Sequence, residues 1–341
     1  MNTSSSLEVN SNKEDSLLLS QALLPVLEDL QQLKPLLKNY LSAKTESSRK
    51  ILQHVFASEG KLVRPAMFFL VSRMLSYRGK HLMPIAAVCE YVHTASLLHD
   101  DVVDSSKLRR NKPTSNSIWG DESAVLVGDL IYSTASELMA NTGYLELVKI
   151  FAASIKKMSE GELLQLEHIF SLDISKETYF TVLGGKTAVL MGAACRAAGI
   201  LAEAPESQKN ALENFGYSLG IAFQLIDDAL DYRSKQTVFG KEIYADLSEG
   251  KVTLPLILLQ EQAKPNEIEA LQQIFAKDHI GNSDVQYVAT LVKKYNTSEQ
   301  VLDIARSYTQ KALGLLTEFF PPSDERSHLE NLAKSLVYRS Y

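Results

Sequence analysis

The chain has 341 residues, 45% of them hydrophobic, and carries a formal net charge of −6. This length can bury a sizeable core in one large domain or two ordinary ones, and an acidic chain without a basic block is not expected to bind nucleic acid. The two cysteines, Cys89 and Cys195, are too few and too isolated for a disulfide framework or a zinc site, which favours buried thiols in a reducing compartment.

The first 14 residues are rich in Ser, Asn and charge, and predict a disordered tail. They lack the basic-then-apolar order of a signal peptide, and no uncharged apolar run of about 18 residues follows. We therefore expect a cytoplasmic protein with no membrane span. Leucines then recur at threes and fours over residues 17–37, with Pro25 and Pro35 as kinks or breaks, and a second helical pattern covers 46–57. These segments predict a helical hairpin.

A loop over residues 58–61 separates the hairpin from a helix that opens at Arg64 and Pro65, because proline is tolerated in a first helical turn. This loop can present Lys61 and Arg64 together, and two cations beside a helix start suit an anion, although alone they would also fit ordinary surface charge. Pro84 begins the helix that follows.

That helix ends in the acidic motif Asp-Asp-x-x-Asp, formed by Asp100, Asp101 and Asp104. A helix turns by about 100° per residue, so the motif is expected to point its three carboxylates in one direction. Directly after it, residues 107–112 hold four cations, whose guanidinium groups suit phosphate.

No proline occurs over residues 115–200, where the pattern predicts three long helices broken near 141–143 and 171–173. Lys186 falls inside the third helix or at a kink in it, among apolar neighbours, and should therefore need an anionic partner. A turn at Pro205 follows.

The helix that starts near residue 206 ends in a second Asp-Asp-x-x-Asp motif, formed by Asp227, Asp228 and Asp231, with Gln224 one turn before Asp228. Residues 232–253 contain two glycines and three lysines, as is typical of a mobile loop over a site. Amphipathic helical patterns follow, and no segment favours a strand, so the fold is expected to be all-α.

Two such acidic motifs in different halves of the chain predict a metal site. One copy alone would fit a solvated helix end. Six carboxylates near apolar sequence repel one another and need cations, and an oxygen-only ligand set favours Mg²⁺, which keeps positions open for substrate phosphates.

These motifs resemble those of the trans-isoprenyl diphosphate synthase (polyprenyl synthetase) family, and especially its long-chain bacterial members such as octaprenyl diphosphate synthase. Besides both aspartate motifs, the resemblance includes Gly60-Lys61-Leu62-Val63-Arg64-Pro65, Arg109-Arg110, Gly185-Lys186-Thr187, Phe223-Gln224, Gly240-Lys241 and Gly250-Lys251. It implies one all-α domain over residues 15–341, of about a dozen helices around a central cavity, and a homodimer.

The resemblance also implies the reaction, in which an allylic diphosphate such as farnesyl or geranylgeranyl diphosphate ionises and is attacked by isopentenyl diphosphate. The aspartates of both motifs and Lys186 would be catalytic, with two or three Mg²⁺ per site held chiefly by Asp100, Asp104 and Asp227. The product would serve as a quinone side chain and be handed to the membrane.

Substrate contacts are implied for two groups of residues. Isopentenyl diphosphate would be bound by cations and a histidine, namely Lys61, Arg64, His93 and Arg110, and Arg109 would be a further substrate-binding residue. The allylic substrate would be contacted by Lys186, Thr187, Gln224 and Lys241, with Lys251 as a weaker candidate. His99 is expected to be structural.

Product length is expected to depend on the residues one helical turn before Asp100. Ala95 and Ser96 are small, where short-chain relatives often have an aromatic plug, so a tunnel should be open there. We expect a product of the heptaprenyl to decaprenyl class, limited deeper down or on a facing helix near Ser133 to Met139.

Four alternatives remain open at this stage. They are a short-chain farnesyl or geranylgeranyl diphosphate synthase, a terpene cyclase, an HD-type metal phosphohydrolase using His54 and His99-Asp100, and a non-catalytic subunit of a heteromeric synthase. The cations that would bind isopentenyl diphosphate weigh against the cyclase. The second motif and Arg109-Arg110 weigh against the phosphohydrolase, and the completeness of both motifs weighs against the non-catalytic subunit.

Overall fold

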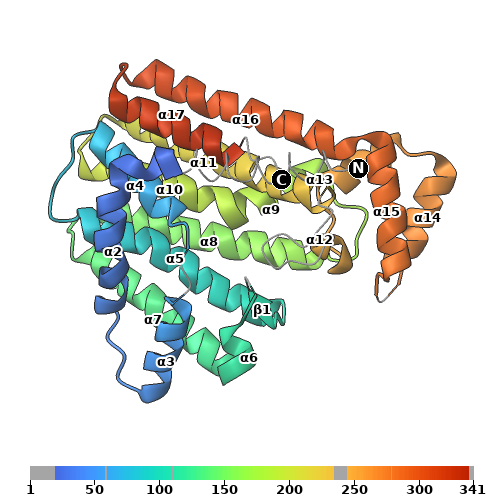
Figure 1. Cartoon of the computed structure of the whole chain (residues 1–341), viewed down its shortest axis with the longest axis horizontal. Helices are drawn as coiled ribbons and strands as arrows, with labels where there is room; N and C mark the ends of the chain where they lie inside the picture. The colour runs from blue at the N-terminus through green and yellow to red at the C-terminus, as the bar shows by residue number, and fades with distance from the viewer. Residues whose placement is uncertain (1–19, 58–59, 110, 234–243, 278, 338–341) are drawn as a thin grey trace, which may run out of the picture.

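Helices account for most of the residues that the structure describes (Figure 1). The computed structural model describes residues 20–57, 60–109, 111–233, 244–277 and 279–337. The predicted tail, Arg110 and Lys241 lie outside these ranges. In chain order the helices are η1 (Leu24–Val26), α2 (Leu27–Asn39), α3 (Glu46–Val55), α4 (Val63–Met74), α5 (Leu82–Val103), α6 (Ser115–Trp119), α7 (Asp121–Ala140), α8 (Leu145–Glu167), α9 (Lys176–Leu183), η2 (Gly184–Ala188), α10 (Val189–Leu201), α11 (Glu206–Asp231), α12 (Ala245–Ser248), α13 (Leu254–Gln262), α14 (Pro265–Phe275), α15 (Asn282–Tyr295), α16 (Thr297–Phe319) and α17 (Asp324–Val337).

The all-α prediction is confirmed, with one small exception. Strands β1 (Leu108–Arg109) and β2 (Lys112–Pro113) pair antiparallel over two residues each, directly after the first acidic motif. Both helices of the predicted hairpin are present, as α2 and α3, but they pack mainly against other elements, α2 against α4 and α5 and α3 against α6 and α7. Pro35, however, does not end its helix, since α2 continues to Asn39. Because Leu33 and Leu37 are buried on either side of it, packing outweighs the hydrogen bond that the proline removes.

α10 lies at the centre of the bundle because its sequence is apolar on all sides. Its small residues, such as Ala194 and Ala198, have no exposed surface, and it packs against α4, α8 and α11. α7 packs along α5, and α16 packs along α11 (Figure 1). Among the described residues, no helix combines the length and the apolar character that crossing a membrane requires.

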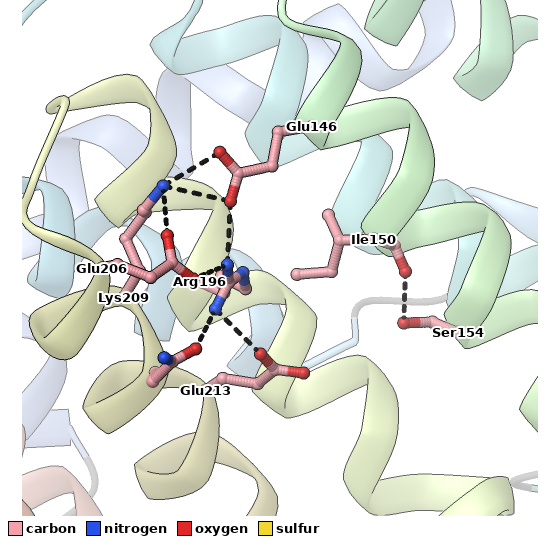
Figure 2. A network of polar contacts seen from close by, with 8 residues as sticks. Glu146, Ile150, Ser154, Arg196, Glu206, Lys209 and Glu213 are labelled. Atoms are coloured by element: carbon pink, nitrogen blue, oxygen red, sulfur yellow. Dashed lines mark hydrogen bonds and ion pairs between the residues drawn. The ribbon is translucent and has the colours of Figure 1, made fainter.

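A network of charged side chains joins the far end of α10 to the first turns of α8 and α11 (Figure 2). The Arg196 guanidinium lies 2.9 Å from Glu146, 2.5 Å from Glu206 and 3.2 Å from Glu213, and the Lys209 ammonium also contacts Glu146 and Glu206. Burial alone would lower the pKa of Arg196, but these carboxylates outweigh it and raise the pKa. We call these five residues the Arg196 network.

Candidate active site

The first acidic motif occupies the last turn of α5. Asp104 caps the helix, and Asp100 lies one turn before it, partly exposed. Burial raises the pKa of Asp100 to about 6, an effect that Lys186 opposes and Glu162 reinforces. Asp101 is only 5% exposed, its Oδ1 accepts a hydrogen bond from Arg109 Nε at 2.8 Å, and Arg109 Nη2 lies 2.8 Å from the same oxygen in an ion pair. The middle aspartate therefore binds the β1 strand to the end of α5.

The second motif occupies the last turn of α11, and again its outer aspartates are partly exposed while its middle one is buried. Asp227 and Asp231 are partly exposed, whereas Asp228 is 4% exposed. Its Oδ2 accepts a hydrogen bond from the Tyr179 hydroxyl at 2.5 Å, and its Oδ1 accepts one from Gln224 Nε2 at 2.9 Å. Burial raises the pKa of Asp228, and the carboxylate of Asp246 raises it further.

The expectation that each motif points three carboxylates in one direction is wrong. The first and last members are nearly in line along the helix, but the middle one is rotated by about 100° onto the helix flank, where neighbouring elements bury it. Asp101 and Asp228 are accordingly occupied by protein donors. Only the outer aspartates of each motif keep the exposure that binding a ligand requires.

Lys186 lies on η2, a single π-helical turn between α9 and α10, as the predicted kink required. This turn is held by close backbone approaches: a Cβ at Gly185 would come within 2.6 Å of the Lys157 carbonyl, and one at Gly220 within 2.5 Å of the Ala188 Cα. Lys186 Nζ contacts Glu162 of α8 at 3.1 Å, which is the anionic partner that its apolar surroundings demanded.

Two bridges connect the motifs across the site. One runs from Asp100 to Lys186 by electrostatic attraction, and continues through the neighbouring Thr187, whose hydroxyl donates to Gln224 Oε1 at 3.1 Å. The other is Lys251, whose ammonium lies 3.7 Å from the Asp104 carboxylate and is also attracted by the carboxylate of Asp246. Asp246 in turn interacts electrostatically with Asp228 of the second motif. The two motifs therefore lie at the same end of the bundle.

The backbone before Lys251 is fixed by a contact with the end of α8. Gly250 has φ of +75°, and its carbonyl accepts a hydrogen bond from the Phe170 N–H at 2.9 Å. A Cβ at Gly250 would collide with the Phe170 ring at 2.7 Å. Burial alone would lower the pKa of Lys251, but Glu249, Asp104 and Asp246 outweigh it and raise the pKa, so the side chain remains a cation.

The cations assigned to isopentenyl diphosphate are described only in part. Lys61 is exposed, just before α4, and Arg64 is partly buried in the first turn of that helix, where its Nε makes no hydrogen bond with the described residues. Burial lowers the pKa of Arg64, while Glu90 of α5 opposes that shift. His93 lies two turns before Asp100 on α5 and is partly buried.

His99 is held by contacts with α7. Its Nε2 lies 3.1 Å from the Val125 carbonyl and 3.6 Å from the Asp129 carboxylate, and its ring packs against Tyr132 at 5.6 Å. Gly128 makes room for this ring, since a Cβ there would lie 2.3 Å from Nε2. These contacts agree with a structural role for His99.

Ala95 and Ser96 lie on α5, one turn below Asp100. Ala95 has no exposed surface, and the Ser96 hydroxyl donates to the His93 carbonyl at 2.8 Å. The facing helix is α7, as expected. Its Tyr132 lies near Asp100. Burial and the Asp100 carboxylate together raise the pKa of Tyr132 to about 12.

The structure adds four residues that sequence reasoning did not select: Glu162, Tyr179, Asp246 and Tyr132. Tyr179 precedes Lys186 by seven residues, which is about two helical turns, so its position near the site could have been inferred. Asp246 precedes Lys251 by five residues in the same loop. Glu162 and Tyr132 carry no local signal, because each reaches the site from another helix.

The donor chemistry of the site fits Mg²⁺ shared with a diphosphate. In the described ranges, no group of three or more His, Cys, Asp or Glu side chains is arranged to hold a metal ion by itself. Mg²⁺ commonly takes only one or two carboxylates from protein and fills its octahedron with water and substrate phosphates. The outer aspartates supply oxygen donors of this kind.

The comparisons with known proteins agree with this arrangement. Residues 45–292 match the polyprenyl synthetase family. The octaprenyl diphosphate synthase of Escherichia coli (strain K12) is 33% identical over 92% of this chain and 96% of its own length. Two solved structures have a TM-score of 0.89 and 34% identity: a decaprenyl diphosphate synthase from Rhodobacter capsulatus, covering 94% of this chain and 99% of that chain, and a polyprenyl synthase from Caulobacter crescentus CB15 complexed with calcium and isoprenyl diphosphate, covering 94% and 98%.

Proposed function

Because this chain belongs to the polyprenyl synthetase family, we propose that it condenses isopentenyl diphosphate head-to-tail onto an allylic diphosphate, repeatedly, to a long all-trans product. It is a prenyltransferase, and its relatives carry octaprenyl, nonaprenyl and decaprenyl names. The observation that supports the mechanism best is the meeting of both aspartate motifs with Lys186 and Lys251 at one end of the bundle.

The acidic residues would hold Mg²⁺, for which we propose Asp100, Asp104 and Asp227 as ligands and two or three ions per site. When bound, Mg²⁺ supplies positive charge that stabilises the departing diphosphate. Asp101 and Asp228 orient their own motifs through Arg109, Tyr179 and Gln224. Asp231, at the end of the second motif, would place a further carboxylate near the Mg²⁺ ions from the same helix turn.

Two lysines would assist the separation of charge. Lys186 and Lys251 lie beside Asp100 and Asp104, so both can donate to the phosphate oxygens of the allylic substrate as the carbon–oxygen bond breaks. Thr187 and Gln224 border the same position, and Lys241 would add a further cation. The chain offers no dedicated general base, so the departing diphosphate is the acceptor that we assign to the proton lost after attack.

The second substrate would be held by cations that need no metal. We assign isopentenyl diphosphate to Lys61, Arg64, His93, Arg109 and Arg110, so that its double bond meets the carbocation. Lys61→Ala should therefore raise the Michaelis constant for isopentenyl diphosphate by about tenfold, the loss of one charged hydrogen bond, while leaving that of the allylic substrate nearly unchanged. An increase confined to the allylic constant would mean that the two diphosphate sites are reversed.

The product would leave the metals along α5, past Ala95 and Ser96, with farnesyl or geranylgeranyl diphosphate as the starter. We further propose that the enzyme acts as a homodimer in the cytoplasm and passes its product to the membrane for a quinone side chain. These points rest on the similarity of this chain to the polyprenyl synthetase family.

One assay tests the proposal against its rivals. Purified protein with Mg²⁺, labelled isopentenyl diphosphate and farnesyl diphosphate should yield a single long product when the dephosphorylated lipids are separated by chromatography. Phosphate release without a longer lipid would indicate a phosphohydrolase, and no turnover by the protein alone would indicate a subunit that needs a partner. A product of twenty carbons or fewer would indicate a short-chain synthase.

A further inference from the structure

The middle aspartate of the second motif is enclosed by hydrogen bonds from two different helices. Tyr179, from α9, donates to Asp228 Oδ2 at 2.5 Å, and Gln224, one turn back on α11, donates to Oδ1 at 2.9 Å. Tyr179 is 5% exposed and Asp228 is 4% exposed. A buried carboxylate whose two oxygens are each fixed by a separate donor has little freedom to rotate.

These hydrogen bonds continue into the π-helical turn. The side chain of Gln224 is used at both ends, because its Oε1 accepts from the Thr187 hydroxyl at 3.1 Å while its Nε2 donates to Asp228. Thr187 is 8% exposed and is the residue after Lys186. Tyr179, Asp228, Gln224 and Thr187 thus form one continuous chain, which links α9, α11 and η2.

The position of Tyr179 is itself well determined. The Ser175 side chain caps the start of α9 by accepting from the Thr178 N–H at 3.0 Å, and the backbone N–H of Tyr179 donates to the Ser175 carbonyl at 2.9 Å. Next along the chain, Phe180 stacks on Tyr308 of α16 with ring centroids 6.0 Å apart. The tyrosine hydroxyl is therefore presented to Asp228 by a helix that is capped at its start and packed along its length.

We infer that Tyr179 is a positioning residue for the reaction: through Asp228 and Gln224, it fixes the second acidic motif relative to the turn that carries Lys186. This inference rests on the proposed function, because it concerns how Mg²⁺ and the allylic diphosphate are held. Asp227 adjoins Asp228 and Lys186 adjoins Thr187. Breaking one of these hydrogen bonds would therefore move a proposed metal ligand relative to a phosphate-binding cation. A displacement of a fraction of an ångström is costly for groups that must meet one ligand.

Tyr179→Phe tests this directly, since it removes one oxygen and keeps the packing. We expect kcat to fall about tenfold, the half-saturating Mg²⁺ concentration to rise several-fold, and the Michaelis constant for isopentenyl diphosphate to stay unchanged. Tyr308→Phe is the matched control, because it removes a hydroxyl from the aromatic pair beside α9 and should alter none of these values. Rates equal to wild type in Tyr179→Phe would overturn the inference.

A second measurement separates this inference from the proposed function. Calorimetric titration of inorganic diphosphate in the presence of Mg²⁺ needs no turnover, and Tyr179→Phe should weaken this binding several-fold while Tyr308→Phe does not. Unchanged diphosphate binding in Tyr179→Phe contradicts the positioning role even in an active enzyme. A wild-type protein that binds diphosphate with Mg²⁺ but transfers no prenyl group contradicts the proposed function alone.

A double-mutant cycle distinguishes positioning from general stability. If the chain acts as one unit, Tyr179→Phe and Thr187→Val should lower kcat together by less than the product of their separate effects. Independent, multiplicative effects would show that Tyr179 acts only locally. Should Tyr179→Phe fail to fold, Gln224→Met breaks the same chain at its centre with nearly equal side-chain volume, and it must shift the Mg²⁺ dependence for the inference to stand.

Discussion

At one end of α10, Arg196 and Lys209 satisfy the three carboxylates of the Arg196 network, so positive and negative groups nearly balance within the protein (Figure 2). Before the start of α10, where Lys186 lies on η2, the carboxylates of both motifs gather with Glu162, Asp246 and Glu249. Among the described residues, these carboxylates outnumber the cations that contact them, which are Lys186, Lys251 and Arg109. We therefore expect this end to gain stability when cations bind with the substrate.

The comparison shows how one helix can serve stability and function at opposite ends. Charges paired inside the protein hold α8, α10 and α11 together at their Arg196 end. We expect the carboxylates at the Lys186 end to reduce the stability of the empty protein and to favour the binding of metal and diphosphate. Mutations at the two ends should therefore separate activity from stability.

The largest effect is expected at the unbalanced end. Asp100→Ala or Asp227→Ala should lower kcat by on the order of 10²–10³-fold or more, because each removes a proposed Mg²⁺ ligand that faces the leaving diphosphate. The Tm should stay level or rise, since one repelling carboxylate is gone. Steady-state kinetics and thermal denaturation measure both quantities. Asp303→Ala, on the exposed face of α16, is the control, and near-normal turnover at saturating Mg²⁺ in either variant would contradict the metal assignment.

Next in size is the effect on product length. A prenyl chain that grows from the aspartate motifs must run along α5 toward the end of the bundle that holds the Arg196 network. There the His81 ring packs against Tyr144 at the start of α8. Ala95→Phe or Ser96→Phe should block this path about one isoprene unit below Asp100 and shorten the product to farnesyl or geranylgeranyl length. Chromatography of the labelled products shows the result. Unaltered product length in both variants would place the growing chain elsewhere.

A smaller effect is expected at the paired end. Arg196→Met keeps the apolar stem but removes the guanidinium that three glutamates share, so the protein should lose about 1 kcal/mol of stability and about 2 °C of Tm. Turnover per folded molecule should be unchanged. Arg306→Met, which removes a more exposed arginine that also contacts two acidic residues, should cost less. A loss of kcat in Arg196→Met without a change in Tm would contradict the claim that the Arg196 network serves stability rather than activity.

The smallest effect concerns pH. Hydrogen bonds from Lys209 and then Arg196 hold the pKa of Glu206 below its ordinary value of 4.5. A depressed folded pKa contributes stability above the unfolded value, and this contribution disappears as the pH falls through the folded one. The wild type should therefore exceed Glu206→Gln in Tm at about pH 6 and lose that advantage by about pH 3. An advantage that grew on acidification would contradict the sign of the shift.

Much of the fold could be predicted because its causes are local. Apolar periodicity located the long helices, and the need of Lys186 for an anionic partner followed from its apolar neighbours. Pro35 was expected to kink or break its helix, and the break does not occur because the burial of α2 outweighs a single missing hydrogen bond, and burial depends on the neighbouring helices. The site was less predictable, since Glu162 and Tyr132 reach it from helices that carry no motif.

The sequence alone determined the candidate groups for the chemistry: two acidic motifs at helix ends and one lysine that requires an anionic partner. Both follow from residue type and from spacing along a single helix. Only the tertiary structure decided which aspartates remain available to a ligand. Asp228 is held by Tyr179, a donor 49 residues away on another helix, and a contact over such a separation depends on how helices pack, which no local pattern encodes. Asp101 is held by Arg109, from the short strand that follows its own helix.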